Sequence, residues 1–330
     1  MKIFRLIVLI LHLGILVLLF GVLLNAYVPP KIFPWFNLIS LGFPLLIIGY
    51  VLITFFWIFS WKKRAFAFML LGLFFLNPVK RWVNYSTEKK EASDLKIVSF
   101  NVKGGKFGTE NIENFINQQN ADIVLFQEDS GYEYKLNNLK KNYTSPVVST
   151  YSKYKTIAHK ELFEGMYNEE FNAYAEFSDI EIKGKIYRVI NLYLQPFKFE
   201  KSMVKLNGNT EQDEQKVKEI VKRLIPTFKM HQDQVASIRT SIDESPYPVI
   251  LAGDFNSVPN SYEYYHLSKN LNDAFFEVGR GSGTSFHDYK YPLRIDFVFT
   301  SPSIKPLTYH VDRSIKLSDH FPVISTFSLK

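Results

Sequence analysis

The 330-residue chain contains no cysteine. This absence excludes a disulfide scaffold, a zinc ribbon, a thiol nucleophile and an iron–sulfur site. It leaves the redox compartment open, because a chain without cysteine suits either environment. Charged residues make up only 22% of the chain, whereas hydrophobic residues make up 47% and include 30 Phe and 19 Tyr. That composition excludes a disordered chain and can fill a sizeable core.

Positive charge is also missing from most of the chain. Residues 1–94 hold ten basic and three acidic residues, which accounts for the whole net charge of +7. Residues 95–330 hold 29 basic and 29 acidic residues and are neutral overall. This part of the chain therefore lacks the general positive field that draws in nucleic acid. Only a local basic patch could still bind nucleic acid.

Three hydrophobic runs begin the chain, at about residues 6–28, 39–61 and 65–83. The first two have the roughly 20 residues that cross ~30 Å of hydrocarbon, and we expect both to span a membrane. A cleaved signal peptide is the alternative for the first run, but Asn25–Val28 lacks a small-x-small cleavage site. The third run spans only if Lys80 and Arg81 extend toward the interface. We expect a third span there, with a helix lying in the interface as the alternative.

Basic residues orient these spans. Lys2 and Arg5 precede the first run, and Lys62–Arg64 separates the second from the third, whereas the loop between the first two carries only Lys31. The positive-inside rule then places the N-terminus and the second loop in the cytoplasm. With three spans the rest of the chain is extracytoplasmic, and with two it is cytoplasmic. We expect three, hence a multi-pass protein of a bacterial inner membrane with an extracytoplasmic domain.

Beyond the anchor, residues 84–94 form a polar linker without hydrophobic period, and a domain follows at 95–330. Strands are expected near 96–100, 122–126, 154–163, 172–182, 185–194, 247–251, 295–299 and 323–328. Helices are expected near 110–119, 212–243 and 261–269, and Pro226 should kink or split the second of them. This order predicts transmembrane helices followed by an α/β domain, in which two mixed sheets pack as a four-layer α-β-β-α sandwich.

The polar residues that draw attention each close or follow an apolar strand: Asn101, Glu128, Asp254, Asn256, Asp296, Asp319 and His320. Strand ends meet at one edge of a sheet, a usual place for a site on a rigid scaffold. Clustered carboxylates repel one another unless a cation lies among them. Oxygen ligands with a single His point to Mg²⁺ or Mn²⁺ rather than to zinc. Each residue alone has an ordinary alternative, as a turn, a helix cap, a solvated acid or an ion-pair partner.

Five short motifs carry a resemblance to a known family. They are SFNV (99–102), QE (127–128), GDFN (253–256), RIDFVF (294–299) and SDHFPV (318–323). Their set and order resemble the endonuclease/exonuclease/phosphatase superfamily over about residues 95–330. The hydrophobic N-terminal segment resembles a membrane-anchored bacterial branch of it. The resemblance implies a metal-dependent phosphoester hydrolase.

The resemblance also implies roles for single residues. Glu128 is then the main metal ligand, and Asn101 and Asp319 complete or support the metal site. The remaining residues act on substrate and water: Asp254 orients or deprotonates the attacking water, Asn256 holds a phosphate oxygen, His320 contacts the scissile phosphate, and Asp296 orients the His320 ring.

Two positions depart from the common pattern. Tyr193 stands where many members carry His, and a tyrosine hydroxyl at this place can bind phosphate; the alternative is a core aromatic. Lys103 stands where abasic endonucleases place an Asp, which speaks against a second metal there and suggests a phosphate contact instead.

The sequence thus predicts a membrane-anchored, Mg²⁺-dependent hydrolase of phosphate esters. Nucleic acid, a phospholipid headgroup and a small phosphoester all remain open as substrates, and no obligate protein partner is inferred. The alternative is a non-catalytic membrane protein that binds a phosphorylated ligand, but every metal and base position is filled. The other histidines, His231 among them, lie in no motif, and we interpret them as surface or core residues.

Overall fold

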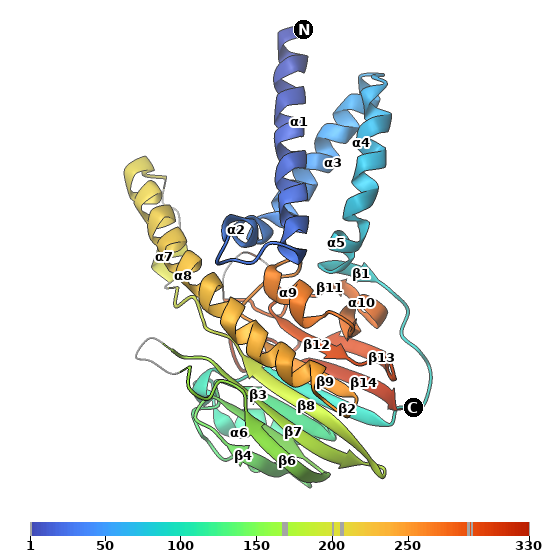
Figure 1. Cartoon of the computed structure of the whole chain (residues 1–330), viewed down its shortest axis with the longest axis vertical. Coiled ribbons are helices and arrows are strands. Elements are labelled where there is room, and N and C mark those ends of the chain that lie inside the picture. The colour runs from blue at the N-terminus through green and yellow to red at the C-terminus, as the bar shows by residue number, and fades with distance from the viewer. Residues whose placement is uncertain are drawn as a thin grey trace.

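The computed structural model describes residues 2–166, 171–199, 201–204, 208–288, 291 and 293–329. A group of N-terminal helices stands on an α/β sandwich, and the long helix α8 (Thr210–Asp243) crosses the outside of the sandwich (Figure 1). Both parts make direct contact, because side chains from the N-terminal helices share one apolar cluster with Val258, Phe286 and Ile295 of the sandwich.

The N-terminal segment differs from the three uniform spans expected. Its elements are α1 (Lys2–Leu23), η1 (Leu24–Ala26), α2 (Trp35–Leu41), α3 (Phe43–Phe59), α4 (Arg64–Gly72), η2 (Leu73–Phe75) and α5 (Leu76–Lys80). Within the described residues, one helical stretch, Lys2–Ala26, is by itself long and apolar enough to cross a membrane. The pair α2 and α3 meets the same test only when taken together, since the two are bent by 70°. The second expected run is therefore two helices that meet at Gly42.

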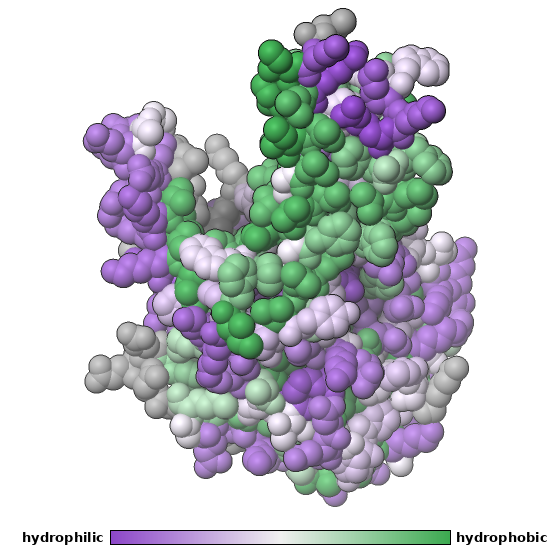
Figure 2. Space-filling model, turned by 45° about the horizontal axis from the view of Figure 1, so that its top comes forward, coloured by the Kyte–Doolittle hydropathy of each residue, from purple (hydrophilic) through white to green (hydrophobic). Residues whose placement is uncertain are grey.

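These helices are apolar on their outward faces as well as on the faces that pack together. Ile3, Ile10 and Val17 on α1 are 76%, 61% and 70% exposed, and Leu52 and Phe59 on α3 are 63% and 78% exposed. In Figure 2 this part of the molecule forms a continuous hydrophobic surface that ends in a hydrophilic tip. A helix that is apolar all round is typical of a membrane span or of a large protein core.

Two six-stranded mixed sheets form the sandwich. One has the order β10-β12-β9-β8-β7-β6 and the other β13-β14-β2-β3-β5-β4. Their strands are β2 (Leu95–Asn101), β3 (Ile123–Gln127), β4 (Lys140–Thr144), β5 (Val148–Ser152), β6 (Lys155–Glu161), β7 (Tyr174–Ile182), β8 (Lys185–Tyr193), β9 (Val249–Asp254), β10 (Asn272–Asp273), β12 (Asp296–Thr300), β13 (Ile304–Val311) and β14 (Val323–Leu329). The pairs β2–β3 and β8–β9 are parallel, and the other pairs are antiparallel.

Alternation along the strands builds the expected layers. In β2, Leu95 and Ile97 face the core between the sheets, whereas Val98 and Phe100 face α6 (Thr109–Gln119). On the other sheet, Ile250 of β9 faces the inter-sheet core and Leu251 packs under α8. Successive strand residues point to opposite faces, so each sheet needs a cover on both sides. The prediction of two packed mixed sheets with outer helices is confirmed.

Pro226 and the linker behave differently from expectation. Pro226 lies inside the unbroken helix α8, where the buried side chains of Leu224 and Phe228 pack on either side of it. Such packing offsets the hydrogen bond that proline cannot donate. The linker begins as strand β1 (Val83–Tyr85), which pairs with β11 (Arg280–Ser282). Asn84 donates to the carbonyls of Phe275 and Phe276 in and beside α10 (Ala274–Val278), so this end of the anchor is fixed to the domain.

Candidate active site

The predicted polar residues lie at the ends of central strands. Asn101 ends β2, Asp254 ends β9, and Asp296 begins β12. Asp254 and Asp296 are direct partners across the antiparallel β9–β12 pair, and Tyr193 is the partner of Asp254 across the parallel β8–β9 pair. The topology alone therefore gathers side chains from both sheets at one end of the sandwich.

Asn101 joins the two sheets at this end. Its amide Nδ2 donates to Oε1 of Glu128 at 2.9 Å and to Oδ2 of Asp254 at 3.0 Å. Asn101 is fully buried and Glu128 is partly exposed. A single neutral amide thus lies between two carboxylates, and Nε2 of His320 is 3.6 Å from the same Asp254 oxygen. Such a pair attracts a cation.

A histidine lies between two aspartates on the other side of Asp254. Nδ1 of His320 is 2.8 Å from Oδ2 of Asp296, and Nε2 is 3.6 Å from Oδ2 of Asp254. All three side chains are buried, and the ring of Phe286 packs edge-on against His320 with centroids 5.0 Å apart. Burial alone would lower the pKa of His320, but Asp296 and Asp254 raise it above its ordinary value. Burial raises the pKa of Asp254, and Asp296 adds to that rise. His320 acts in the opposite direction and lowers the pKa of Asp254.

Asn256 sits in a constrained turn directly after Asp254. Its φ of 43° lies in the left-handed region, which non-glycine residues adopt at a cost. Its amide N donates to Oδ1 of Asp254 at 2.8 Å, and its side-chain Nδ2 donates to the Leu194 carbonyl at 2.8 Å. Leu194 in turn donates its own N–H to the Asp254 carbonyl at 3.0 Å. The turn is thereby fastened to the segment that follows β8.

Tyr193 is buried at the end of β8, 3% exposed, and packs with Val148 and Tyr174. Burial raises the pKa of its hydroxyl well above the ordinary value, and the Glu128 and Asp254 carboxylates add to that rise. The hydroxyl therefore faces the carboxylates while the ring belongs to the packed interior. The donor and core interpretations of Tyr193 describe two parts of the same side chain.

Lys103 lies beside the predicted metal ligands. Its ammonium pairs with Oδ2 of Asp319 and is 3.8 Å from Oδ2 of Asp288. Its backbone N–H donates to Oδ1 of Asn101 at 3.0 Å. Burial alone would raise the pKa of Asp319, but His320 and Lys103 hold it below the ordinary value. The position therefore carries a fixed positive charge next to Asp319.

The donor chemistry fits a hard divalent cation. Glu128 and Asp319 are carboxylates, and Mg²⁺ and Mn²⁺ prefer such oxygen ligands. Asn101 turns its Nδ2 toward Glu128, and its Oδ1 accepts the Lys103 N–H. A second group, Asp254, Asp296 and His320, has ligand atoms within 4.8 Å of one another. Its His320 ring already meets a carboxylate at each nitrogen. Oδ1 of Asp296 is a buried atom without a hydrogen-bond partner.

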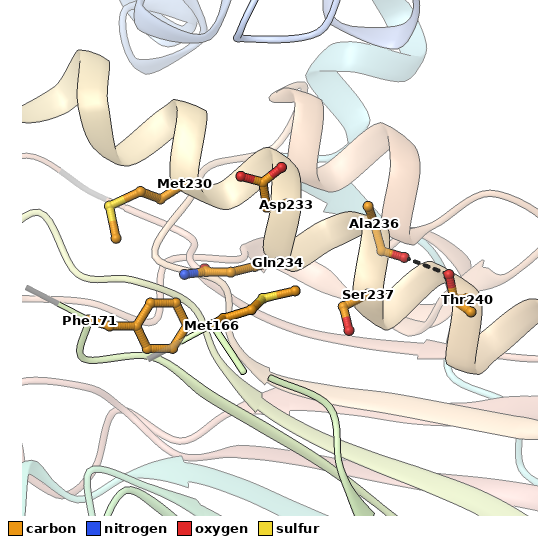
Figure 3. A pocket seen from close by; sticks show the side chains of 8 residues that line it. All are labelled: Met166, Phe171, Met230, Asp233, Gln234, Ala236, Ser237 and Thr240. Carbon is orange, nitrogen blue, oxygen red and sulfur yellow. Dashed lines mark hydrogen bonds between the residues drawn. The ribbon is translucent and has the colours of Figure 1, made fainter. Parts of the chain in front are cut away.

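Two surface hollows lie elsewhere and share no residue with this cluster. The first, about 630 Å³, runs along the C-terminal half of α8, where Met230 and Gln234 lie near Met166 and Phe171 (Figure 3). The second, of the same volume, is lined by residues of β6 and the following loop, including Glu161 and Leu162.

Sequence reasoning missed a buried network that adjoins the site. His231 of α8 is fully buried, and its Nδ1 lies 2.6 Å from Oε1 of Glu263, which is also fully buried. The prediction for His231 included a core position, but nothing in the motifs pointed to Glu263. No local sequence pattern connects His231 with Glu263, because the two residues lie on different helices, 32 positions apart.

Two mixed sheets that bring carboxylates, amides and a His–Asp pair to one end have the architecture of a family of phosphoester hydrolases. The chain belongs to the Endonuclease/Exonuclease/phosphatase family, whose model matches residues 98–320. Residues 4–82 match a separate domain of unknown function, DUF8431, which ends close to the expected anchor boundary at residue 83. No curated protein matches the chain.

Solved structures share the fold of the domain. The 3′ phosphatase NExo from Neisseria, in a structure bound to a product DNA hairpin, is 18% identical with a TM-score of 0.51, covering 71% of this chain and 99% of that one. A family protein from Leptotrichia buccalis is 14% identical with a TM-score of 0.50, covering 71% and 100%. A mannosyl-6-phosphatase from Bacteroides thetaiotaomicron is 16% identical with a TM-score of 0.48, covering 71% and 100%. At these identities the likeness concerns the fold.

Proposed function

We propose that this chain is a membrane-anchored hydrolase of phosphate esters that works with Mg²⁺ or Mn²⁺. The observation that carries the proposal is the position of Asn101, whose amide joins Glu128 to Asp254 across the two sheets, beside the His320–Asp296 pair. Glu128 holds the ion, with Asn101 and Asp319 in support. When bound there, the ion supplies positive charge to an anionic phosphate and so lowers the barrier to attack by water.

The chain's own residues have separate tasks in this reaction. Asp254, whose Oδ2 is shared with Asn101 and faces His320, orients the attacking water and takes its proton. Asn256 offers a neutral donor to a phosphate oxygen. His320 places positive charge where negative charge develops, and Asp296 holds its ring through Nδ1. Tyr193 donates its hydroxyl toward the phosphate.

The membrane part of the proposal rests on the exposed apolar faces of α1 and α3. In water such faces would be a large unfavourable surface, and a bilayer covers them. We propose that α1, α3 and the α4 to α5 segment each enter the bilayer, while α2, whose Asn37 bonds to the domain, stays outside the hydrocarbon. Three crossings give the extracytoplasmic domain that the basic residues indicate. Exposed Trp35 and Tyr27, near the base of the helices, suit the membrane interface.

The test is a substrate panel on the full-length protein in detergent or nanodiscs. It contains bis(p-nitrophenyl) phosphate, double-stranded and abasic DNA, RNA, inositol phosphates and phospholipid vesicles, each with Mg²⁺ and with EDTA. We expect hydrolysis that depends on Mg²⁺, and we expect weak turnover of DNA because residues 95–330 carry no net charge. Binding of phosphorylated ligands without turnover of any ester would replace this proposal by the non-catalytic one.

Tyr193→Phe tests the donor role of the hydroxyl. We expect kcat to fall about tenfold, which corresponds to one hydrogen bond of ~1.4 kcal/mol, with little change in thermal stability. Tyr174→Phe is a matched control, because Tyr174 lies in the same small cluster and its hydroxyl donates to Glu161 rather than to the site. Steady-state kinetics and thermal melts measure both variants. A stable Tyr193→Phe protein with full activity would leave only the core role.

A further inference from the structure

The anchor and the active site meet at a buried polar seam formed by Asn37, Glu263, His231, Ser257 and Gln195. Asn37 belongs to α2 of the N-terminal helices and is 1% exposed. Its Nδ2 donates to both carboxylate oxygens of Glu263, at 3.0 Å and 2.9 Å, and its Oδ1 accepts from the Tyr262 N–H at 2.7 Å. A single anchor side chain thus makes three hydrogen bonds to the first turn of α9 (Tyr262–Leu267).

Glu263 continues the seam toward the domain. It is fully buried, and besides Asn37 it meets Nδ1 of His231 at 2.6 Å and the Ser257 hydroxyl at 2.9 Å. Burial alone would raise the pKa of Glu263, but the bonds from His231 and Asn37 hold it below the ordinary value. A buried carboxylate in this state depends on all its partners, because an unpaired buried charge is costly.

Two routes lead from Glu263 to Asn256. The short route passes through Ser257, the next residue along the chain. The longer route passes through His231, whose Nε2 lies 2.7 Å from the Gln195 carbonyl; Gln195 follows Leu194, and the Leu194 carbonyl accepts the bond from Asn256 Nδ2. The phosphate-binding turn is thus attached at two points to a network that ends on the anchor.

The backbone of this turn is strained, so its conformation depends on the contacts that surround it. Asn256 and Asn260 have φ values of 43° and 69°, both in the left-handed region. Such conformations persist where surrounding contacts determine them. The anchor supplies two more of these contacts, since Asn25 donates to the Asn260 carbonyl at 3.0 Å and Arg81 donates to its Oδ1 at 2.9 Å. The anchor therefore contacts strained Asn260 directly, and it reaches strained Asn256 through Glu263 and Ser257.

We propose that the N-terminal helical segment is a positioning element of the active site, in which Asn37 fixes Asn256 through Glu263 and its partners. The anchor then does more than hold the enzyme at a membrane. This inference rests on the proposed function, because it assigns Asn256 to a phosphate oxygen. It adds that residues 95–330 by themselves lack part of what orders the site.

The test compares Asn37→Ala with Asn77→Ala in the full-length protein. Asn77 is an exposed amide of α5 on the same segment and serves as the matched control. We expect Asn37→Ala to lower kcat for bis(p-nitrophenyl) phosphate about tenfold or more, the scale known for residues that orient a ligand-binding group. We expect the inhibition constant of inorganic phosphate to rise by a similar factor, and both values to be unchanged in Asn77→Ala.

A double variant separates positioning from general stability. Adding Asn37→Ala to Asn256→Ala should cost little beyond Asn256→Ala alone, because both act on the same contact. A lower melting temperature with unchanged kcat and unchanged phosphate inhibition, or fully additive losses, would overturn the inference. If Asn37→Ala does not fold, Asn37→Ser, which keeps a short polar group, carries the same comparison. A wild-type protein that hydrolyses no ester would instead contradict the proposed function.

Discussion

Replacing Asp254 by Asn is expected to lower kcat at least ~10²-fold at saturating Mg²⁺, the scale for loss of a general base. The amide keeps an oxygen that can accept the Asn256 N–H, which now bonds Oδ1 at 2.8 Å, so the turn should survive. What disappears is the negative charge that accepts from Asn101 and faces His320. Glu128→Gln should cause a loss of similar size, because an amide oxygen is a poorer ligand for a divalent cation than a carboxylate.

The melting temperature of both variants should stay close to that of the wild type. For Glu128 the reason is partial exposure. For Asp254 the reason is different, since the residue is only 1% exposed. Its buried charge is costly, and burial raises its pKa, so removal of the charge offsets the donor–donor contact that the new amide nitrogen makes with Nδ2 of Asn101.

Asp179→Asn is a control that should lose stability and keep its kcat. Asp179 is also a buried aspartate, but it makes a two-bond ion pair with Arg188 at 2.8 Å and 2.9 Å and lies outside the catalytic cluster. Breaking a buried pair destabilises a protein by roughly 3–5 kcal/mol. We expect a lower melting temperature with unchanged kcat per folded molecule. Near wild-type hydrolysis by Asp254→Asn or Glu128→Gln would remove the assigned site.

The cluster at the strand ends could be predicted because its residues lie in short motifs attached to strong strand patterns. Short, nearly continuous apolar runs mark where β2, β3 and β9 end, and the side chains after them gather once the sheets pack. The parallel pairing of β8 with β9, and thus the meeting of Tyr193 with Asp254, follows from topology rather than from any local pattern.

The seam between anchor and domain could not be predicted in the same way. Asn37 and Glu263 are 226 residues apart, and each looks ordinary in its own segment. The hydropathy of the second run likewise gave no sign that it breaks at Gly42, because both α2 and α3 are apolar. That break lets α2 reach α9 and α8 instead of continuing the line of α3.

The His320–Asp296 pair should behave as one unit. His320→Gln keeps a neutral donor in the buried position between two aspartates, yet we expect kcat to fall by roughly 10²–10³-fold, as on removal of an electrostatic donor. Asp296→Asn should cost less, because Nδ1 of His320, now 2.8 Å from Oδ2 of Asp296, still finds an amide oxygen. The ring keeps its place but loses the charge that favours its protonated form.

The double variant decides how the two residues are connected. If Asp296 acts only through His320, His320→Gln with Asp296→Asn should be no slower than His320→Gln alone. Asp296 also raises the pKa of Asp254, and any effect that passes through that carboxylate would appear as an additional loss in the double variant. Steady-state kinetics on bis(p-nitrophenyl) phosphate, with thermal melts to confirm folding, measure all four proteins of the cycle. Losses that multiply in the double variant would show that Asp296 acts on the reaction independently of the ring it holds.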